Sequence, residues 1–369
     1  MFYILMKIAN KIIGSGSRCF IVAELSGNHH QKYEEAVELV RAAKESGADA
    51  VKLQTYTADT ITLNSDKKWF QFGGKDNPDS WKNRTLYDLY TRGNTPWDWQ
   101  PKLKKLADGL GIILFSSPFD ETAVDFLEAM DVPCYKIAAY EATDFILLRK
   151  VAQTGKPVII SFGYSSEEEV QFALDTLRAN GAKDIVALHC VTGYSDQPKL
   201  EDMHLRNIQD LRDRFGAISG FSDNNAGIDM PLMAAAVGAK VIEKHFILDR
   251  KMGGPDERFS IEPKELKELV ARIRALESGE EKVVVPGSVL GKIYYGPVSA
   301  IEKYNMRLRR SLFAGRDIKK GELLTKDNVR DVRPAFGLET KYYDQVIGKR
   351  AIKDIEFATP LSWELISNE

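Results

Sequence analysis

Two lysines stand inside short apolar runs of this sequence, where a buried charge needs compensation. Lys52 and Lys136 are each flanked by residues typical of buried strands. An unpaired ammonium group in such a place is costly, so either an acid or a bound anion must balance it. Ser161 and Ser222 end two other apolar runs and could donate hydrogen bonds to a phosphate without adding charge. The pattern predicts an anion site; the alternatives are a snorkelling lysine or an ion pair such as Lys52 with Glu24.

Strand alternation groups a second set of polar residues. Lys52 and Gln54 lie two positions apart, as do Glu243 and His245, so each pair shares one face of its strand. A neutral imidazole such as that of His245 could ligate a divalent metal, although a histidine at a strand end is more often only hydrogen-bonded. Three residues offer oxygen ligands within reach: Asp223, Asn224 and Glu24.

These residues belong to a pattern that repeats eight times between residues 20 and 277. Each repeat has a short run rich in Val and Ile, a few polar or glycine residues, and then a stretch with the apolar spacing of a helix. The expected strands are 20–25, 50–55, 112–117, 134–139, 157–162, 185–190, 217–222 and 240–246. The expected helices are 33–46, 101–110, 121–130, 145–154, 166–180, 201–215, 230–237 and 263–276.

Strands that alternate with helices favour a parallel sheet with helical crossovers. Eight such units over this length predict an α/β fold, a (β/α)8 TIM barrel. A doubly wound open sheet is the alternative, but no glycine-rich dinucleotide loop follows any of the strands. In a barrel the active site lies at the C-terminal ends of the strands, where the polar residues described above stand.

Two segments break the repeat. Residues 56–99 are too long for a plain loop and carry many aromatic residues, which predicts a lid or pocket wall, with a satellite hydrophobic cluster as the alternative. After residue 276 the pattern becomes mixed and then changes to a compact tail with short strands and turns. We therefore expect a barrel domain at 1–280, a linker at 281–305 and a small domain at 306–369.

The composition is that of an ordinary globular protein. The 369 residues are 44% hydrophobic and 28% charged, with a net charge of −2, so no general attraction to nucleic acid or to an anionic membrane is expected. The three cysteines are odd in number and stand in apolar runs, which favours free thiols in a reducing compartment. No apolar run reaches membrane-spanning length and no signal peptide is recognised, so we expect a cytoplasmic protein.

Several of these segments together resemble the sialic acid synthase family. In the barrel they are 23–29 (AELSGNH), 52–56 (KLQTY), 115–120 (FSSPFD), 135–138 (YKIA), 243–246 (EKHF) and 253–256 (GGPD). In the tail, 310–313 (RSLF) and 332–334 (VRP) resemble the antifreeze-like (SAF, β-clip) domain of that family. The segments 86–90 (LYDLY) and 95–97 (TPW) look most like its pseudaminic acid synthase branch.

The resemblance implies a carbon–carbon bond-forming transferase. C3 of phosphoenolpyruvate would attack the aldehyde of an open-chain acylamino-sugar, water would add at C2, and phosphate would leave. For the pseudaminic acid branch the acceptor is 2,4-diacetamido-2,4,6-trideoxy-altrose. The family also implies a divalent metal cofactor, Mn²⁺ or Mg²⁺, and a domain-swapped homodimer.

The resemblance also implies a role for each matching residue. The catalytic residues would be Glu24, Lys52 and Lys136. Phosphoenolpyruvate would be held by Lys52, Ser117, Lys136, Ser161 and Ser222. The sugar would contact Gln54, Tyr194 and Asp256. It would also contact Arg333, from the tail of the partner subunit. The metal would be bound by His245 and Asn224.

The sequence departs from the family pattern at the end of the seventh strand. The family has Ser-Asp-His there, and its histidine is the second metal ligand, whereas this chain has Ser222, Asp223 and Asn224. An asparagine oxygen suits Mg²⁺ or Mn²⁺ but replaces imidazole poorly for softer metals. Three alternatives stay open: an N-acetylneuraminate or legionaminic acid synthase, a metal-deficient non-catalytic relative, and an aldolase with Lys136 as a Schiff-base amine.

Overall fold

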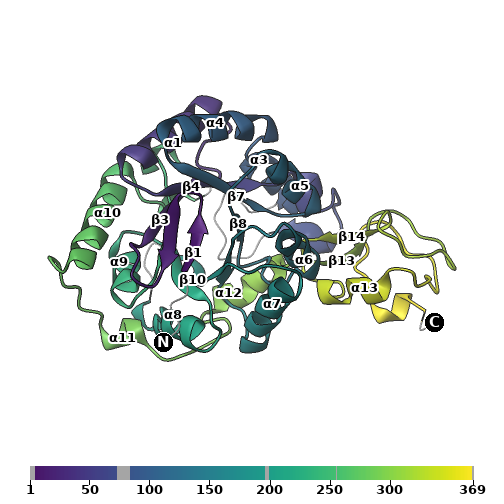
Figure 1. The fold of residues 1–369 in the computed structure, drawn as a ribbon. Coiled ribbons are helices and arrows are strands. Elements are labelled where there is room, and N and C mark those ends of the chain that lie inside the picture. Colours follow the sequence, from purple (N-terminus) through teal and green to yellow (C-terminus); the bar gives the residue numbers. More distant parts are fainter. Residues whose placement is uncertain (1–4, 73–83, 196–198, 255, 368–369) are drawn as a thin grey trace.

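Eight parallel strands form a closed barrel in the computed structural model, which describes residues 5–72, 84–195, 199–254 and 256–367. The strand order around the barrel is β10-β11-β12-β3-β4-β7-β8-β9, and β9 pairs with β10 to close it. Helices surround the barrel and a smaller C-terminal domain lies at one side (Figure 1). The predicted (β/α)8 architecture is therefore confirmed, and the open doubly wound sheet is excluded.

The barrel strands lie within a few residues of their expected ranges. They are β3 (Phe20–Glu24), β4 (Ala50–Thr55), β7 (Ile113–Pro118), β8 (Tyr135–Ile137), β9 (Val158–Phe162), β10 (Ile185–Ser195), β11 (Ile218–Asn225) and β12 (Val241–His245). Both β10 and β11 run further than expected, so their last residues extend to the mouth of the barrel.

The helices alternate with these strands as expected. They are α1 (Tyr33–Glu45), α4 (Gln100–Leu110), α5 (Glu121–Ala129), α6 (Phe145–Gln153), α7 (Glu167–Ala179), α8 (Arg206–Asp213), α9 (Asp229–Ala236) and α10 (Pro263–Ser278). Local chemistry sets the ends. Ser166 and Glu169 form a reciprocal capping box at the start of α7, and α4 ends at Gly111, whose φ of 68° is left-handed. The expected helix 201–215 is divided into a short 3-10 turn, η4 (Leu200–Asp202), and α8.

Inside the barrel, an apolar layer lies below a polar layer. The lower inward positions belong to one buried cluster that includes Val22, Ala50, Phe115, Cys134, Ile159, Leu188 and Val241. Residues two positions apart share a strand face, so the next inward residue on each strand lies two positions further along the chain. These positions hold Glu24, Lys52, Ser117, Lys136, Ser161, Cys190, Ser222 and Glu243, one from each of the eight strands.

A short hairpin, which the sequence pattern did not predict, closes the bottom of the barrel. β1 (Leu5–Ile8) pairs in antiparallel fashion with β2 (Lys11–Gly14). Met6, Ile8 and Ile13 are buried and join the apolar layer inside the barrel, whereas Ile12 is 61% exposed. The hairpin therefore keeps water out of the end of the barrel opposite to the polar layer.

The segment 56–99 joins the barrel to the C-terminal domain. It contains α2 (Ala58–Ile61), η1 (Lys68–Phe70), β5 (Gln71–Phe72), β6 (Arg84–Thr85), α3 (Leu86–Gly93) and η3 (Trp97–Trp99). Phe70 packs against Phe313 of the C-terminal domain at a ring-centroid distance of 5.3 Å, and Trp97 packs against Phe126 of α5 at 4.7 Å. Trp81 lies outside the described residues. The hydrophobic-cluster interpretation thus holds for Phe70, and Leu86 of α3 packs with Tyr140 and Tyr164, while the lid or pocket wall stays a prediction.

The chain beyond α10 forms two further short helices and then the small domain. The helices are α11 (Gly287–Leu290) and α12 (Ala300–Asn305). The C-terminal domain contains η7 (Met306–Leu308), β13 (Ser311–Ala314), β14 (Val329–Val332), η8 (Thr340–Tyr342), α13 (Tyr343–Val346) and η9 (Trp363–Leu365). The expected boundaries at 280 and 305 stay predictions.

The C-terminal domain rests on α6 and on the segment 56–99. Ile146 of α6 is part of the apolar core of the C-terminal domain, and Arg149 of α6 pairs with Asp344 at 2.7 Å. The backbone N–H of Arg333 donates to the Ile61 carbonyl at 2.9 Å. These contacts hold the side chain of Arg333 near the mouth of the barrel.

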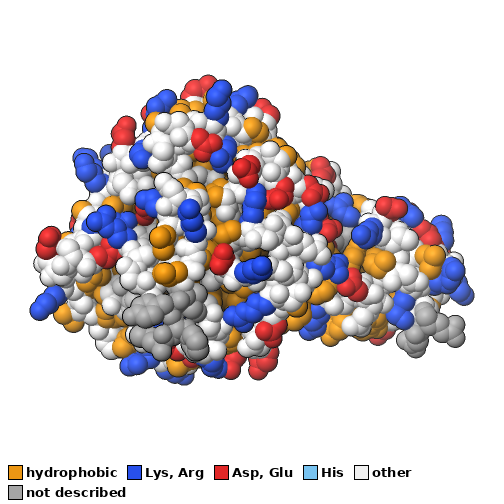
Figure 2. All heavy atoms as spheres, in the orientation of Figure 1, with side chains coloured by type: hydrophobic (Ala, Val, Ile, Leu, Met, Phe, Trp, Pro, Cys, Tyr) orange, Lys and Arg blue, Asp and Glu red, His pale blue; other side chains and the backbone are white. Residues whose placement is uncertain are grey.

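The molecular surface shows mixed charge. Acidic and basic side chains are interspersed over the face in Figure 2, in keeping with the net charge of −2. None of the described helices combines the length and the apolar character that crossing a bilayer requires.

Candidate active site

Four charged residues meet at the centre of the polar layer. Lys52 Nζ lies 2.5 Å from Glu24 Oε2 and 3.8 Å from Glu243 Oε1, and Lys136 Nζ lies 3.4 Å from the same Glu243 oxygen. All four side chains are buried. The Lys52–Glu24 ion pair, considered as an alternative from the sequence, therefore exists, but it belongs to a larger cluster that also contains Lys136.

Hydroxyl groups line the same layer. Ser117 Oγ accepts a hydrogen bond from Lys52 Nζ at 3.2 Å, and Ser222 Oγ donates to Glu243 Oε1 at 3.0 Å. Ser161 Oγ is buried and has no hydrogen-bond partner among the described residues. A buried hydroxyl without a partner is costly, so Ser161 is available to a ligand that enters the barrel.

The two carboxylates of the cluster have different electrostatic surroundings. Burial raises the pKa of Glu24 above its ordinary value, although Lys52 opposes the shift. Burial also opposes the charged form of Glu243, but Lys136 and Lys52 outweigh it and lower the pKa of Glu243. Glu24 is therefore the acid whose environment favours protonation, and Glu243 is the fixed anion between the two amines.

The two amines also differ. Burial lowers the pKa of Lys136, and the neighbouring Lys52 adds to the shift against the attraction of Glu243. For Lys52 the effect of burial is outweighed by Glu24 and Glu243, which raise its pKa overall. An incoming anion would therefore stabilise the charged form of Lys136 in particular.

A second group of polar residues lies beside Glu24 toward the mouth. Gln54 Nε2 donates to Glu24 Oε1 at 2.9 Å and to Ser26 Oγ at 3.3 Å. Ser26 Oγ in turn donates to Asp256. Burial raises the pKa of Asp256 to about 6, and the hydrogen bond from Ser26 moderates the shift. Gln54 and Asp256 are thus connected to the charged cluster through shared partners.

His245 has the features of a metal ligand. Burial, followed by the charge of Lys52, lowers the pKa of His245 to about 3, so its imidazole is neutral at physiological pH. Its Nδ1 atom is buried without a hydrogen-bond partner among the described residues and lies 3.8 Å from Asp256 Oδ2. Within the described ranges no three His, Cys, Asp or Glu side chains gather closely enough to complete a metal site. A cation held beside His245 would therefore take most of its ligands from water or substrate oxygens.

Asn224 lies two positions after Ser222, on the inward face of β11. Its amide nitrogen donates to Cys190 Sγ at 3.1 Å and to the Val191 carbonyl at 3.2 Å. Its Oδ1 atom accepts no hydrogen bond from the described part of the chain, which leaves an oxygen for a cation. The roles of Asn224 and His245 as metal ligands stay predictions.

One residue that the sequence suggested as an oxygen ligand, Asp223, has a structural partner instead. Asp223 points out of the barrel and pairs with Lys244 at 2.7 Å, both fully buried, so it cannot supply the oxygen ligand that the sequence suggested. This outward direction follows from alternation, because Asp223 lies one residue from the inward Ser222.

The predicted sugar contact Arg333 comes from the C-terminal domain. Arg333 pairs with Glu141 of its own chain, Nη2 to Oε1, at 2.5 Å, beyond the end of β8. The side chain of Tyr194 lies outside the described residues. The structure thus brings together the predicted phosphoenolpyruvate residues, Gln54, Asp256 and the predicted metal ligands.

Two further residues stand at this site, Glu243 and Glu302, for which no role was predicted from the sequence. Glu243 stands between both lysines, and its position was signalled by its shared strand face with His245. Glu302 of α12 is buried and accepts hydrogen bonds from the N–H of Thr192 at 2.6 Å and from Thr192 Oγ1 at 3.0 Å. No local signal identified Glu302, because its helix reaches the barrel only through the tertiary fold.

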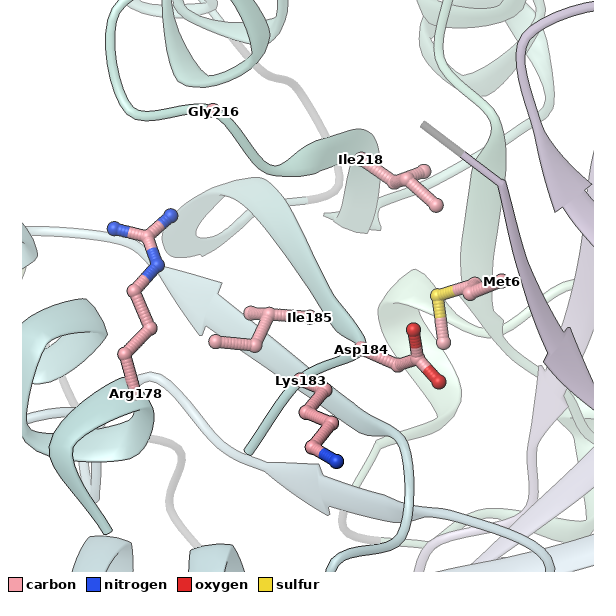
Figure 3. A pocket seen from close by; sticks show the side chains of 7 residues that line it. All are labelled: Met6, Arg178, Lys183, Asp184, Ile185, Gly216 and Ile218. Atoms are coloured by element: carbon pink, nitrogen blue, oxygen red, sulfur yellow. The ribbon is translucent and has the colours of Figure 1, made fainter. Parts of the chain in front are cut away.

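A separate cavity of about 50 Å³ lies at the opposite end of the barrel (Figure 3). It is lined by Met6 of the hairpin, by Arg178, and by residues at the starts of β10 and β11. This volume has room for a few water molecules at most, so the cavity cannot hold a sugar.

Comparison with known proteins identifies relatives for both domains. Residues 39–283 match the model of the NeuB family and residues 309–367 match that of the SAF domain. The chain is 40% identical to pseudaminic acid synthase of Campylobacter jejuni, over 96% of this chain and 98% of the relative. It is 36% identical to N,N'-diacetyllegionaminic acid synthase of Legionella pneumophila, over 96% of both chains.

A solved structure has the same arrangement. The spore coat polysaccharide biosynthesis protein SpsE of Bacillus subtilis superposes with a TM-score of 0.83 at 33% sequence identity. The match covers 99% of this chain and 100% of that one, so it includes both the barrel and the C-terminal domain.

Proposed function

The chain belongs to the NeuB family, and from this premise we propose that it is a pseudaminic acid synthase. It condenses phosphoenolpyruvate with 2,4-diacetamido-2,4,6-trideoxy-altrose and water to give the nonulosonic acid and phosphate. The observation that carries the proposal is the inward polar layer, in which two ammonium groups approach one Glu243 oxygen within 3.8 Å. N-acetylneuraminate and legionaminic acid synthases are the alternatives within the family.

The polar layer holds phosphoenolpyruvate. Lys52 and Lys136 attract its phosphate and carboxylate groups, and the hydroxyl groups of Ser117, Ser161 and Ser222 donate hydrogen bonds to them. The unpartnered hydroxyl of Ser161 supports this role. C3 of phosphoenolpyruvate then attacks the aldehyde carbon, and the new carbon–carbon bond leaves an electron-poor C2.

Glu24 handles the proton of the water that adds at C2, after which phosphate leaves. Its raised pKa and its hydrogen bonds from Gln54 and the Ser26 N–H support this role. Gln54, Tyr194, Asp256 and Arg333 contact the sugar. The short chain of hydrogen bonds from Glu24 through Gln54 and Ser26 to Asp256 supports a sugar site directly above the phosphoenolpyruvate site.

A divalent cation, Mn²⁺ or Mg²⁺, completes the site in this proposal. His245 and the Asn224 oxygen would hold it, next to the Asp256 carboxylate. When bound, the cation supplies Lewis-acid polarisation of the aldehyde oxygen. The neutral state of the His245 imidazole supports metal ligation.

A phosphate-release assay with defined sugars tests the function. Phosphate should appear only when phosphoenolpyruvate and the altrose-type sugar are both present, and EDTA should suppress it. Activity with N-acetylmannosamine instead would move the chain to the sialic acid branch. Borohydride treatment with a keto substrate should trap no adduct on Lys136, because the reaction forms no Schiff base.

We also propose that the enzyme is a homodimer whose subunits exchange C-terminal domains. The support is the family resemblance, which implies that the tail of one subunit reaches the barrel of its partner; within this chain Arg333 pairs with Glu141. Light scattering should give twice the 41.5 kDa mass of the chain. Unfolding and refolding a mixture of Lys136→Met and Arg333→Ala chains should restore about a quarter of the wild-type activity, because one site in each mixed dimer is intact.

The same mixture of Lys136→Met and Arg333→Ala chains would stay inactive if each C-terminal domain served only its own barrel.

A cytoplasmic location is part of the proposal, because Cys19, Cys134 and Cys190 are buried free thiols, which suits a reducing compartment. Cell fractionation with an antibody to the chain tests the location.

A further inference from the structure

Arg333 is held on one edge by a single carboxylate oxygen. Its Nε and Nη2 atoms both donate to Glu141 Oε1, at 3.1 Å and 2.5 Å. Because both bonds end on the same oxygen, this contact alone allows the guanidinium group to pivot. A second contact on the opposite edge is needed to fix its plane.

Tyr90 supplies that second contact. Its hydroxyl oxygen accepts a hydrogen bond from Arg333 Nη1 at 3.0 Å. The guanidinium group also lies near three aromatic rings, with centroid distances of 5.6 Å to Tyr90, 5.5 Å to Phe119 and 4.9 Å to Tyr140. The aromatic faces attract the cation but do not fix its rotation, whereas the Tyr90 hydroxyl does.

Hydrogen-bonding capacity remains for a ligand. A guanidinium group has five N–H donors, and the contacts with Glu141 and Tyr90 use three of them. No other acceptor for this group is present among the described residues. The remaining N–H groups of Arg333 form a compact set of donors suited to a carbonyl oxygen such as that of an acylamino group.

Tyr90 is itself held by the barrel. It lies on α3, which begins after Thr85, whose side chain accepts from the N–H of Asp88. The Tyr90 ring meets the Tyr56 ring edge to face at 5.8 Å, and Tyr56 meets Phe119 at 5.1 Å. Tyr56 follows Gln54 by two residues on the chain, so the position of Tyr90 is connected to the sugar end of the proposed site.

We propose that Tyr90 is a positioning residue that fixes the guanidinium group of Arg333 for recognition of an acylamino group of the sugar. The inference rests on the proposed function, because it takes Arg333 as a sugar contact. It gives the segment 56–99 a part in sugar selection, through one hydroxyl group on α3.

The test compares two tyrosine-to-phenylalanine variants on the same helix. Tyr90→Phe keeps the aromatic ring and removes only the hydroxyl. Tyr87→Phe is the matched control, since the Tyr87 hydroxyl is bonded to Asp59 at 3.0 Å and lies outside the proposed site. Tyr90→Phe should raise KM for the sugar about tenfold to a hundredfold, as expected for one hydrogen bond to a charged group. KM for phosphoenolpyruvate and Tm should stay unchanged.

A double-mutant cycle separates positioning from other effects. In an Arg333→Ala background, Tyr90→Phe should cause no further increase in the sugar KM. The proposal would be overturned by a sugar KM equal to that of Tyr87→Phe, by a parallel rise in both KM values, or by additive effects in the double variant. If the wild-type chain releases no phosphate with any acylamino-sugar, the proposed function fails instead, and calorimetric titration of the sugar still compares the variants.

Discussion

Burial alone does not identify a functional lysine in this protein; the face of the strand does. Lys136 and Lys244 are both buried, and each lies near a carboxylate. Lys244 points outward and makes a closed ion pair with Asp223 between the barrel and its helices. Lys136 points inward and shares Glu243 with Lys52, so its positive charge is only partly compensated. We therefore expect the inward lysine to serve a ligand and the outward one to serve stability.

The two lysines should therefore respond differently to replacement by methionine. Lys136→Met should lower kcat/KM for phosphoenolpyruvate at least about 30-fold, or ~2 kcal/mol, because it removes one partner of a buried charged contact. Lys244→Met is the control, and should lower Tm while leaving KM for phosphoenolpyruvate near the wild-type value. Phosphate release at varied phosphoenolpyruvate, with Tm from calorimetry, measures both. Equal effects of the two variants on KM would contradict the assignment.

Position 224 should control metal affinity. Asn224→His should tighten Mn²⁺ binding at least about tenfold, because imidazole is a stronger ligand than an amide oxygen for this ion. Isothermal titration with Mn²⁺ measures the effect without turnover. His245→Asn should weaken binding in the same experiment. Unchanged affinity in Asn224→His would mean that position 224 does not face the cation.

At the scale of elements, the two ends of the barrel carry side chains of opposite polarity. The C-terminal ends of the strands carry charged and hydroxyl groups, and the N-terminal ends carry an apolar layer. The hairpin β1–β2 covers that apolar layer with Met6, Ile8 and Ile13. It contributes to stability but stands at the wrong end to take part in chemistry.

The hairpin provides a neighbouring pair of isoleucines for a stability test. Ile13→Ala should lower the free energy of unfolding by about 2–4 kcal/mol, because it leaves a cavity in a fully buried layer. Ile12→Ala should change it by less than about 0.5 kcal/mol, since Ile12 is 61% exposed. Urea titration measures both values. The KM values of folded Ile13→Ala enzyme should not change, and a selective rise in either would contradict a purely structural role.

At the scale of the whole molecule, a buried charged cluster joins the barrel to the C-terminal domain. Arg310 and Arg333 face the carboxyl groups of Glu141, Asp144 and Asp331. Two positive charges balance only two of the three carboxylates, so the cluster favours protonation of one acid. Burial raises the pKa of Asp331 to about 6 against the opposing charge of Arg310, and burial and the neighbouring Asp331 raise that of Asp144.

This cluster predicts how stability depends on pH. Because the pKa of Asp331 is higher in the folded chain, its protonated form stabilises domain contact fully below pH 3.8, and this stabilisation is lost as pH rises through about 6. Tm of the wild type should therefore fall between about pH 4 and pH 6 through this group. Asp331→Asn should flatten that slope. Asp344→Asn, at an exposed ion pair with Arg149 on the same interface, should keep the wild-type slope, and a wild-type slope in Asp331→Asn would contradict the assignment.

Much of the site was accessible from local sequence. The alternation of Lys52 with Gln54 and of Glu243 with His245 indicated which side chains share a face, because the period of two is a property of each strand alone. The expected barrel strands follow from the apolar runs, and residue types indicated an anion site at Lys52 and Lys136, whereas phosphoenolpyruvate as the anion was implied by the family resemblance. What alternation could not supply was the distance across the barrel, which depends on strand register and closure. For that reason the position of Glu243 between both lysines was missed.

The sequence by itself determined the barrel, the inward polar layer and the departure at Asn224, because periodicity and residue type are local properties. Only the tertiary structure decided which groups meet from distant parts of the chain. It placed the hairpin under the apolar layer, Glu302 against Thr192, and Arg333 between Glu141 and Tyr90. These contacts join elements separated by long stretches of sequence, so they depend on how whole elements pack and not on any local pattern.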